Sequence, residues 1–365
     1  MIRVLVLLNS INYTSIPFET TLRIAEKDSI EVTIASFYDD NMTNITMNRC
    51  VCDLPVKFLT LGGDSRLDKN AWNTFRRILK NGYDLVHTHH NFSGSVARLL
   101  SHLEGVPVVN TEHRDHSSFS LLQNIVNAPT LRLADRIVSN SQVTQDSFRW
   151  YEQLLVNHDQ LEVVHNGVDI ERIQKVISDT KYPEDDTFRV CTAARMVPVK
   201  NQSALVRAFD SVVDKHPNSD LIFLGGGPLR GELEQLTSDL KLTDNVQFRG
   251  EVSRERVYEV FAQSDVFAIP SNAEGFCVAA VEAMASGLPV VASDIPIFHE
   301  VVGDNGLFID QTDPNDIAET ILELRGNETE YQKRSQMAKQ RATTEFSLDK
   351  CAEAYYDIYK EVLND

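Results

Sequence analysis

The stretch "DVFAIPSNAEGFCVAAVEAMASGLPVVASD", residues 265–294, contains a complete strand–loop–helix–strand unit. Its apolar start predicts a buried strand, "NAEGF" predicts the loop at the strand's exit, and "VAAVEAMAS" predicts a helix. Gly287, with Pro289 two positions later, is a typical helix end, and "PVVASD" predicts the next strand. Two strands joined by one helix form a parallel crossover, so this stretch predicts an α/β fold.

The same alternation of short apolar runs and amphipathic segments continues in both directions along the chain, which is typical of parallel α/β architecture. In the first half, strands are predicted at residues 2–8, 30–37, 56–61, 84–89, 107–113, 136–141 and 161–167. In the second half, they are predicted at residues 188–196, 219–227, 245–252, 265–271, 289–294 and 305–310.

This pattern indicates two doubly wound domains, and 365 residues also suit two domains. The predicted divisions are an N-terminal domain at 1–170, an acidic linker at 171–187, a second domain at 188–346 and a C-terminal helix at 347–365. That last helix can pack on either domain.

Composition and charge exclude several classes of protein. A net charge of −18 argues against a nucleic-acid binder. No apolar run approaches the roughly 20 residues of a membrane-spanning helix, and the first residues lack a signal peptide's apolar region, which predicts a cytoplasmic protein. The segment after the first strand contains no glycine, so the dinucleotide fingerprint of a Rossmann dehydrogenase is missing there.

Two cations follow the first strand of the second domain. Arg195 and Lys200 flank the turn at Pro198, and Lys200 stands at the start of a predicted helix, where the helix dipole disfavours a cation. An anion bound at this helix start would explain the position, and a diphosphate would suit one guanidinium and one ammonium. The alternative is a pair of solvated surface cations.

A glycine run follows the next strand. Gly225, Gly226 and Gly227 precede Pro228 at a plausible first helical position, and backbone there could approach a phosphate or sugar closely. A tight turn without any ligand explains the same residues.

The two carboxylates of the opening stretch differ in their surroundings. Glu274 falls in the predicted loop, whereas Glu282 falls on a helix that is apolar nearly all round and therefore buried. An unpaired carboxylate inside a protein would cost several kcal/mol, so Glu282 needs a partner. A ribose diol and a buried salt bridge to an arginine are both open.

Several ordered motifs together resemble the retaining glycosyltransferases of family 4, which have the GT-B fold. The resemblance is strongest from about Val163 to Asp310. It rests on "VHNGVD", "RMVPVKN", "LGGGPLRGELEQL", "NVQFRGEV" and the run from "PSNAEGF" to "NGLFID". It implies two Rossmann-like domains facing a cleft, with the N-terminal domain holding the acceptor.

The same resemblance implies roles for individual residues. Arg195 and Lys200 would hold the diphosphate of a nucleotide-sugar donor, Glu274 the donor sugar and Glu282 the ribose. Backbone around Gly275, Phe276, Cys277 and Val278 would also face the donor. The two cations would stabilise the leaving diphosphate, so no metal and no cofactor is expected. In such enzymes the departing phosphate accepts the proton, so no protein nucleophile is named.

Histidines mark the N-terminal domain. His113 in "NTEH" matches a histidine that in relatives faces the sugar and acceptor, although a strand-end histidine bonded to backbone explains it as well. His87, His89 and His90 have the appearance of metal ligands, but alternate positions at a strand end also explain them. Family members commonly have a Gly-Gly loop after the first strand, and "NSINYTSIPFET" stands there instead.

Residues 66–82 are basic, with Trp72 and Phe75 interleaved. They could contact the inner face of a membrane that carries a lipid-linked acceptor, or form a surface helix packed by its aromatic face.

The sequence thus predicts a metal-independent, retaining hexosyltransferase that uses a UDP- or GDP-type sugar donor and a glycan, glycolipid or lipid-linked acceptor. The alternatives are a catalytically silent sugar-nucleotide-binding protein and another GT-B enzyme, such as a nucleotide-sugar epimerase. Residue patterns do not identify the sugar, the acceptor or the oligomeric state.

Overall fold

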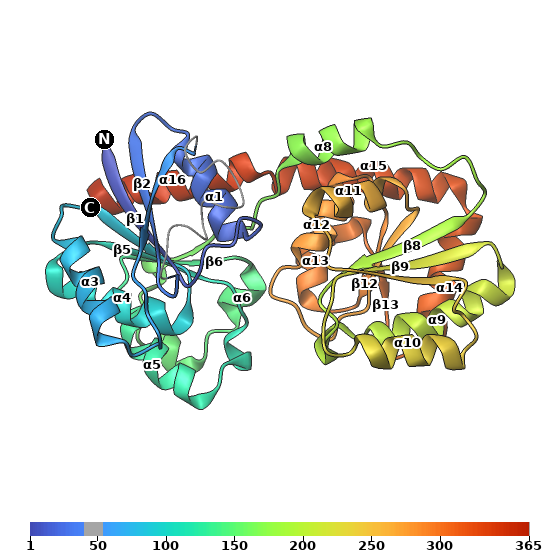
Figure 1. Cartoon of the computed structure of the whole chain (residues 1–365), viewed down its shortest axis with the longest axis horizontal. Coiled ribbons are helices and arrows are strands. Elements are labelled where there is room, and N and C mark those ends of the chain that lie inside the picture. The colour runs from blue at the N-terminus through green and yellow to red at the C-terminus, as the bar shows by residue number, and fades with distance from the viewer. Residues whose placement is uncertain (40–53, 365) are drawn as a thin grey trace. The chain divides into compact units, whose positions relative to one another are not determined.

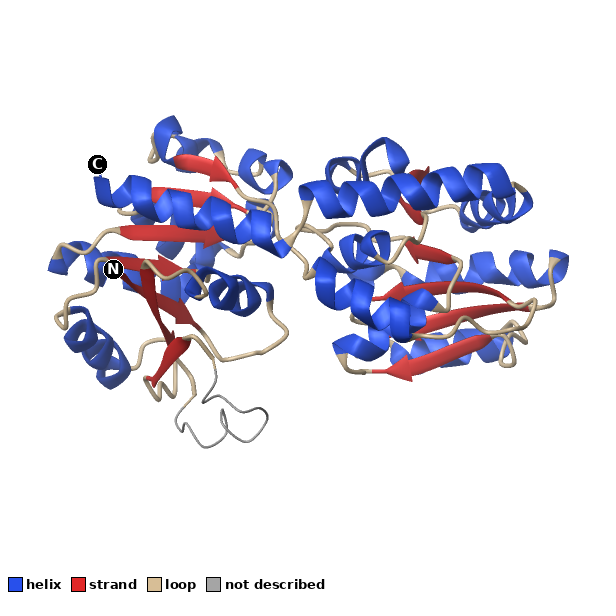
Figure 2. Ribbon diagram, turned by 90° about the horizontal axis from the view of Figure 1, so that it is seen from above, coloured by secondary structure: helices blue, strands red, loops and turns tan. Residues whose placement is uncertain are grey.

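The computed structural model describes residues 1–39 and 54–364 and divides into two compact units. Unit 1 consists of Met1–Gly167 and Leu348–Asp365, and unit 2 consists of Val168–Ser347. Figure 1 shows both units in chain colours, and Figure 2 shows that strands lie between helices in each of them. The predicted α/β class with two Rossmann-like domains is confirmed.

Unit 1 contains a parallel sheet of seven strands in the order β3-β2-β1-β4-β5-β6-β7. Its strands are β1 (Ile2–Leu8), β2 (Ile30–Ser36), β3 (Val56–Thr60), β4 (Leu85–Thr88), β5 (Val108–Glu112), β6 (Arg136–Ser139) and β7 (Leu161–Val163). Its helices are α1 (Ile16–Ala25), α3 (Lys69–Leu79), α4 (Asn91–Glu104), α5 (Leu121–Leu131), α6 (Gln142–Asp146), α7 (Trp150–Gln153) and α16 (Leu348–Asn364).

Unit 2 contains a parallel sheet of six strands in the order β10-β9-β8-β11-β12-β13. Its strands are β8 (Phe188–Ala193), β9 (Ser219–Leu224), β10 (Val246–Gly250), β11 (Val266–Ile269), β12 (Val290–Ser293) and β13 (Leu307–Ile309). Its helices are α8 (Ile170–Asp179), α9 (Gln202–Lys215), α10 (Arg230–Asp239), α11 (Arg254–Ala262), α12 (Val278–Ala285), α13 (Pro296–Val302), α14 (Pro314–Gly326) and α15 (Glu328–Glu345).

Strand positions follow the sequence patterns closely, since every predicted strand segment contains an observed strand. Helix α12 is buried from Ala280 to Ala285 and ends before Gly287, whose φ of +86° is the left-handed geometry expected there. Apolar strands and buried helix faces form the core of unit 2, with Val190, Phe223 and Val266 among the fully buried side chains.

Both ends of unit 2 differ in detail from the predicted divisions. Within the predicted linker 171–187, residues up to Asp179 belong to α8, which packs against α11 and α12. Unit 2 therefore begins at Val168. Helix α16 packs in unit 1, where Tyr355 and Tyr359 join the same apolar cluster as Val4 on β1.

Candidate functional site

The strand order of unit 2 reverses direction between β8 and β11. In open α/β sheets, ligands bind beyond the carboxyl ends of the strands at such a reversal. The loops that leave β8 and β11 meet there, since the Asn272 amide donates to the Val199 carbonyl at 2.8 Å. Arg195, Lys200 and Glu274 all lie on these two loops.

Lys200 and Glu274 form an ion pair at this point, with the Lys200 ammonium donating to Oε1 of Glu274. Ser271 donates to the same oxygen at 2.9 Å. The Glu274 side chain is 8% exposed and the Lys200 side chain 20% exposed. The structure therefore brings these two predicted residues into direct contact, in a largely buried place where such a pair interacts strongly.

Arg195 lies immediately beyond β8 and is exposed. Its carbonyl accepts a hydrogen bond from the Gln202 side chain at 3.1 Å, which ties the loop to the start of α9. Its guanidinium has no hydrogen bond or ion pair with any of the residues described in the structure. The cation is thus positioned through its backbone and is available to an anion.

The glycine run is required by packing between two loops. A Cβ at Gly225 would lie 2.4 Å from the Ala194 carbonyl oxygen, and one at Gly227 would lie 2.4 Å from that of Met196. Both glycines also have positive φ, at +116° and +152°, which other residues rarely adopt. Gly225 and Gly227 therefore fix the backbone on either side of Arg195, and a donor contact by Gly225, Gly226 or Gly227 stays a prediction.

The first turn of α12 follows Gly275 and Phe276 and begins at Val278. Cys277, the residue before the helix, has a φ of +64°. A non-glycine residue in this region is strained, and such strain clusters at functional sites. The Ala280 amide of this turn donates to the Cys277 carbonyl at 3.0 Å, and a helix start in general favours an anion.

Glu282 has protein partners. Arg254 donates to its Oε1 at 2.6 Å and Tyr258 donates to the same oxygen at 2.9 Å. Glu282 is 6% exposed. Burial and the charge of Glu282 raise the pKa of the Tyr258 phenol well above its ordinary value. The salt-bridge alternative is therefore present in the structure, and a ribose contact by Glu282 stays a prediction.

Arg254 and Tyr258 are site residues that the sequence reading missed. They stand four positions apart on α11, so they lie on one face of that helix. The stretch "SRERVYEVF" indicates only that a cation and a phenol share one face of a helix, because their contact with Glu282 spans 24 to 28 positions.

A cavity of about 630 Å³ occupies the corresponding place in unit 1, where the strand order reverses between β1 and β4. His89, His90 and His113 line it, together with Glu112 and the arginines Arg66 and Arg114. The segment after β1 that lacks glycine also lines it, with Asn9, Ser10, Asn12, Ser15 and Pro17.

The cavity histidines are held neutral. Nδ1 of His89 and Nε2 of His113 are 3.2 Å apart. Burial lowers the pKa of His90 and that of His113 to about 4, and burial also lowers the pKa of His89. Because a neutral imidazole both donates and accepts, this wall suits hydroxyl groups.

His87 has a structural place. Its Nδ1 contacts the Tyr359 hydroxyl at 2.6 Å and its Nε2 contacts Thr111 at 2.8 Å. Across residues 1–39 and 54–364, no cluster of three or more histidine, cysteine or acidic side chains is arranged to hold a metal. The alternate positions of His87 and His89 at the end of β4 account for this histidine group.

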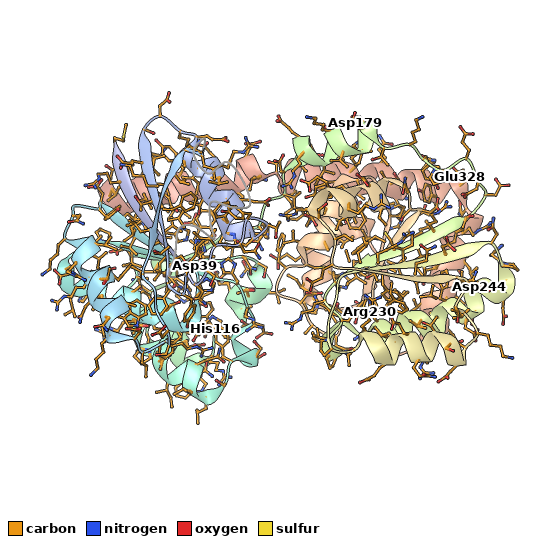
Figure 3. The ribbon with its side chains drawn as sticks, viewed as in Figure 1. Asp39, His116, Asp179, Arg230, Asp244 and Glu328 are labelled. Carbon is orange, nitrogen blue, oxygen red and sulfur yellow. The ribbon has the colours of Figure 1, made fainter. Side chains whose placement is uncertain are left out.

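Behind the cavity lies a buried set of charges that the sequence reading also missed. His116, which Figure 3 labels, is fully buried, with Nδ1 3.0 Å from Glu152 and Nε2 3.6 Å from Glu112. Burial disfavours the charged imidazole, but the two carboxylates outweigh it and raise the pKa of His116 to about 9. Burial likewise opposes the charge of Glu112, yet His116 and Arg98 lower its pKa to about 2.

Residues 66–82 form α3 over Lys69–Leu79, and this helix buries Trp72 and Phe75 against the sheet of unit 1. The packed alternative is therefore correct for both aromatic side chains, which cannot reach a membrane. In the described part of the chain, no helix is both long and apolar enough to cross a bilayer.

Comparisons with known proteins match both units. Residues 174–342 match the model of the glycosyl transferases group 1, and residues 22–172 match that of glycosyltransferase family 4. The D-inositol 3-phosphate glycosyltransferase of Corynebacterium kroppenstedtii is 28% identical over 322 residues, which is 79% of this chain and 69% of that protein.

Two solved structures resemble the chain over nearly its full length. Anabaena HepE in complex with UDP and glucose has a TM-score of 0.78 and 22% identity, covering 99% of this chain and 100% of its own. The sucrose-phosphate synthase of Thermosynechococcus elongatus has a TM-score of 0.80 and 18% identity, covering 100% of both chains. At these identities the likeness shows the shared fold.

Proposed function

The chain belongs to glycosyltransferase family 4, since residues 22–172 match the model of that family and residues 174–342 match the model of the glycosyl transferases group 1, and we propose that it is a retaining, metal-independent hexosyltransferase. Its donor is a nucleotide-diphosphate sugar of the UDP or GDP type. Its acceptor is a glycan, a glycolipid or a lipid-linked sugar. The observation that carries this proposal is the Lys200–Glu274 pair at the strand reversal of unit 2, beside Arg195.

The proposed donor site assigns the charges of unit 2 to parts of the donor. Lys200 has three N–H donors, so it can keep Glu274 and also bind a phosphate oxygen. Arg195 provides the second cation, and the first turn of α12 provides amides for the diphosphate. Glu274 then accepts from the sugar hydroxyls, and Glu282, held by Arg254 and Tyr258, accepts from the ribose.

The proposed reaction breaks the bond between the anomeric carbon and the diphosphate oxygen and forms one to the acceptor oxygen on the same face. The departing phosphate takes the acceptor's proton. Negative charge grows on that phosphate as the bond breaks, and Arg195 and Lys200 stabilise it. Two cations supply the stabilisation that a divalent metal gives in other enzymes, so the proposed reaction needs no metal.

The donor is tested by thermal shift with UDP-, GDP- and ADP-sugars, each with and without EDTA. UDP-glucose comes first because the similar HepE structure contains UDP and glucose. Stabilisation that EDTA leaves unchanged supports the proposal, whereas stabilisation that requires a divalent metal contradicts it.

The activity is tested by donor hydrolysis and by transfer to a panel of acceptors. The panel includes phosphorylated polyols, since the curated relative is named for inositol 3-phosphate and Arg66 and Arg114 line the unit 1 cavity. Glu274→Gln should abolish turnover, while Glu330→Gln, which changes an acid paired with Arg334 on α15, should not. Donor binding without turnover on any acceptor would indicate a silent sugar-nucleotide-binding protein. Conversion of the donor into its epimer would indicate an epimerase.

A further inference from the structure

Helix α5 of unit 1 exposes a row of aliphatic side chains and buries two asparagines, unlike an ordinary surface helix. Leu121, Leu122 and Ile125 are 75%, 65% and 61% exposed, and Pro129 on the same face is exposed too. The spacing of these four residues, which we call the α5 apolar face, places them along one side of a helix. Figure 1 shows α5 at the margin of unit 1.

The opposite side of α5 is buried and partly polar, since it carries two asparagines as well as Ala128 and Leu131. Asn127 is fully buried, accepts from Arg98 at 2.6 Å and donates to Glu112 at 3.4 Å. Thr130 accepts from Arg98 at 2.9 Å. Because α5 must satisfy this buried guanidinium and carboxylate, its asparagines face inward together with Ala128 and Leu131, and the α5 apolar face is turned outward.

Such a face needs a partner, since contiguous exposed apolar patches mark interaction sites. Helix α5 has no charged side chain from Leu121 to Leu131, although the whole chain carries a charge of −18. Neighbouring α7 adds an exposed Trp150, at 72%. Aliphatic side chains with a tryptophan beside them are typical of surfaces that enter a bilayer interface.

The size and position of the face favour a bilayer over a second copy of the chain. A helix of eleven residues is about 16 Å long, so its single face falls short of the roughly 800 Å² per partner of a stable protein interface. The face also adjoins the unit 1 cavity, because Phe119 and Gln123, on either side of Leu121, line that cavity.

We propose that the α5 apolar face docks the protein on the surface of a lipid bilayer, so that the polar head of a membrane-embedded acceptor reaches the cavity beside it. The docking itself rests on the exposed side chains alone. The link to an acceptor rests on the proposed glycosyltransferase function.

Flotation with phosphatidylcholine vesicles, with and without phosphatidylglycerol, tests the docking in the absence of any sugar nucleotide. The full chain should float with both kinds of vesicle, and high salt should not release it. The double variant Leu121→Gln/Ile125→Gln should partition at least about tenfold less, since removing two buried aliphatic side chains from the interface loses that much affinity or more.

Leu67→Gln is the matched control, because Leu67 is 71% exposed and belongs to the basic segment 66–82. It should float like the wild type. Three results would overturn the proposal: no flotation of the wild type, loss of flotation in Leu67→Gln alone, or binding that requires anionic lipid and disappears in high salt. A wild-type dimer that the double variant converts to a monomer would assign the face to a second copy of the chain.

Donor hydrolysis in solution separates this proposal from the proposed function. The double variant should hydrolyse the donor as fast as the wild type, and it should lose transfer only to an acceptor embedded in vesicles, not to a soluble analogue. Vesicle binding without donor hydrolysis in either protein would refute the transferase and leave the docking intact. Hydrolysis without vesicle binding would do the reverse.

Discussion

Unit 1 and unit 2 share one topology, in which the strand order reverses between the first and the fourth strand of each sheet, but the side chains at the two reversals differ in charge. In unit 2 the loops carry Arg195 and the Lys200–Glu274 pair. In unit 1 the cavity wall carries His90 and His113, whose pKa values burial lowers to about 4. The same backbone site is thus charged in one unit and neutral at its histidines in the other.

Under the proposed function, the two reversals suit different ligands. A diphosphate leaving group would require cations, which unit 2 places on loops whose backbone Gly225 and Gly227 fix. Acceptor hydroxyls would require groups that donate and accept without charge, which the neutral histidines of unit 1 can do. Arg98, Glu112 and His116 of unit 1 form a buried network of charges, and Arg66 and Arg114 line the cavity itself.

The largest effect is expected from removing Lys200, one of the two cations at the strand reversal of unit 2. Lys200→Ala should lower kcat by about 10²–10³-fold, the cost of losing one group that stabilises a developing anion, and it leaves Glu274 without its ion pair. The measurement is the steady-state rate of donor hydrolysis.

Lys333→Ala is the control for this change, since Lys333 is 60% exposed and pairs with Glu330 on α15. It should keep the wild-type rate. If Lys200→Ala kept that rate as well, the Lys200–Glu274 pair would only hold the two loops together, and the charge difference between the units would have no catalytic meaning.

The second test concerns the buried pair that positions Glu282. Arg254→Met leaves this carboxylate with an uncompensated buried charge, which should lower the free energy of unfolding of unit 2 by about 3 kcal/mol. Urea unfolding followed by circular dichroism measures it. Both tryptophans, Trp72 and Trp150, belong to unit 1, so the fluorescence transition should stay in place.

Arg256→Met, on the same helix, is the matched control. Arg256 pairs with Glu259 at 2.5 Å, but both side chains are well exposed, so the loss should be at most about 1 kcal/mol. Equal losses in the two variants would mean that Arg254 does not stabilise a buried charge.

In unit 1, two histidines should change the free energy of unfolding in opposite directions as the pH rises. Glu112 and Glu152 raise the pKa of His116 to about 9 against the effect of burial. The protonated imidazole therefore adds stability that is complete below about pH 6.5 and is lost as the pH rises to 9. His113 stays neutral in the fold because burial lowers its pKa to about 4. Stability from His113 is lost as the pH falls from about 6.5 towards 4, because the unfolded chain takes up the proton first.

Tryptophan fluorescence in urea at several pH values reports on unit 1 alone. Each effect should be on the order of 1–3 kcal/mol. His116→Gln should flatten the alkaline slope and His113→Gln the acid slope. If both variants changed the stability on the same side of neutral pH, the charge states assigned to His116 and His113 would be wrong.

Sequence patterns predicted the frame of both units well, since strand and loop positions follow from local periodicity and from Gly287. They also predicted that Arg195, Lys200 and Glu274 lie at strand ends. The partners of these residues were harder to find, because Lys200 meets Glu274 across 74 positions and Glu282 meets Arg254 across 28. Strand order brings such residues together, and local patterns do not encode it.

In unit 1, local patterns did not show which side of a helix is buried. The apolar residues of α5 were unremarkable in the sequence, because periodicity predicts a helix with one apolar face but not which face is buried. The inward turn of Asn127 depends on Arg98, which comes from α4. A basic segment with aromatic residues, 66–82, gave a clearer membrane signal in the sequence, yet its Trp72 and Phe75 are buried.

The smallest effect is expected at the glycine run of unit 2. A Cβ at Gly226 would lie 3.2 Å from the flexible Glu251 side chain, so Gly226→Ala should change the free energy of unfolding by no more than about 0.5 kcal/mol. Gly227→Ala, with its backbone clash at 2.4 Å and positive φ, should cost more than about 1 kcal/mol. Donor affinity decides the role of the loop, because a stable Gly226→Ala protein that binds donor weakly would mean that this backbone faces the ligand. Unchanged affinity in Gly226→Ala would leave the glycines with the single task of placing Arg195.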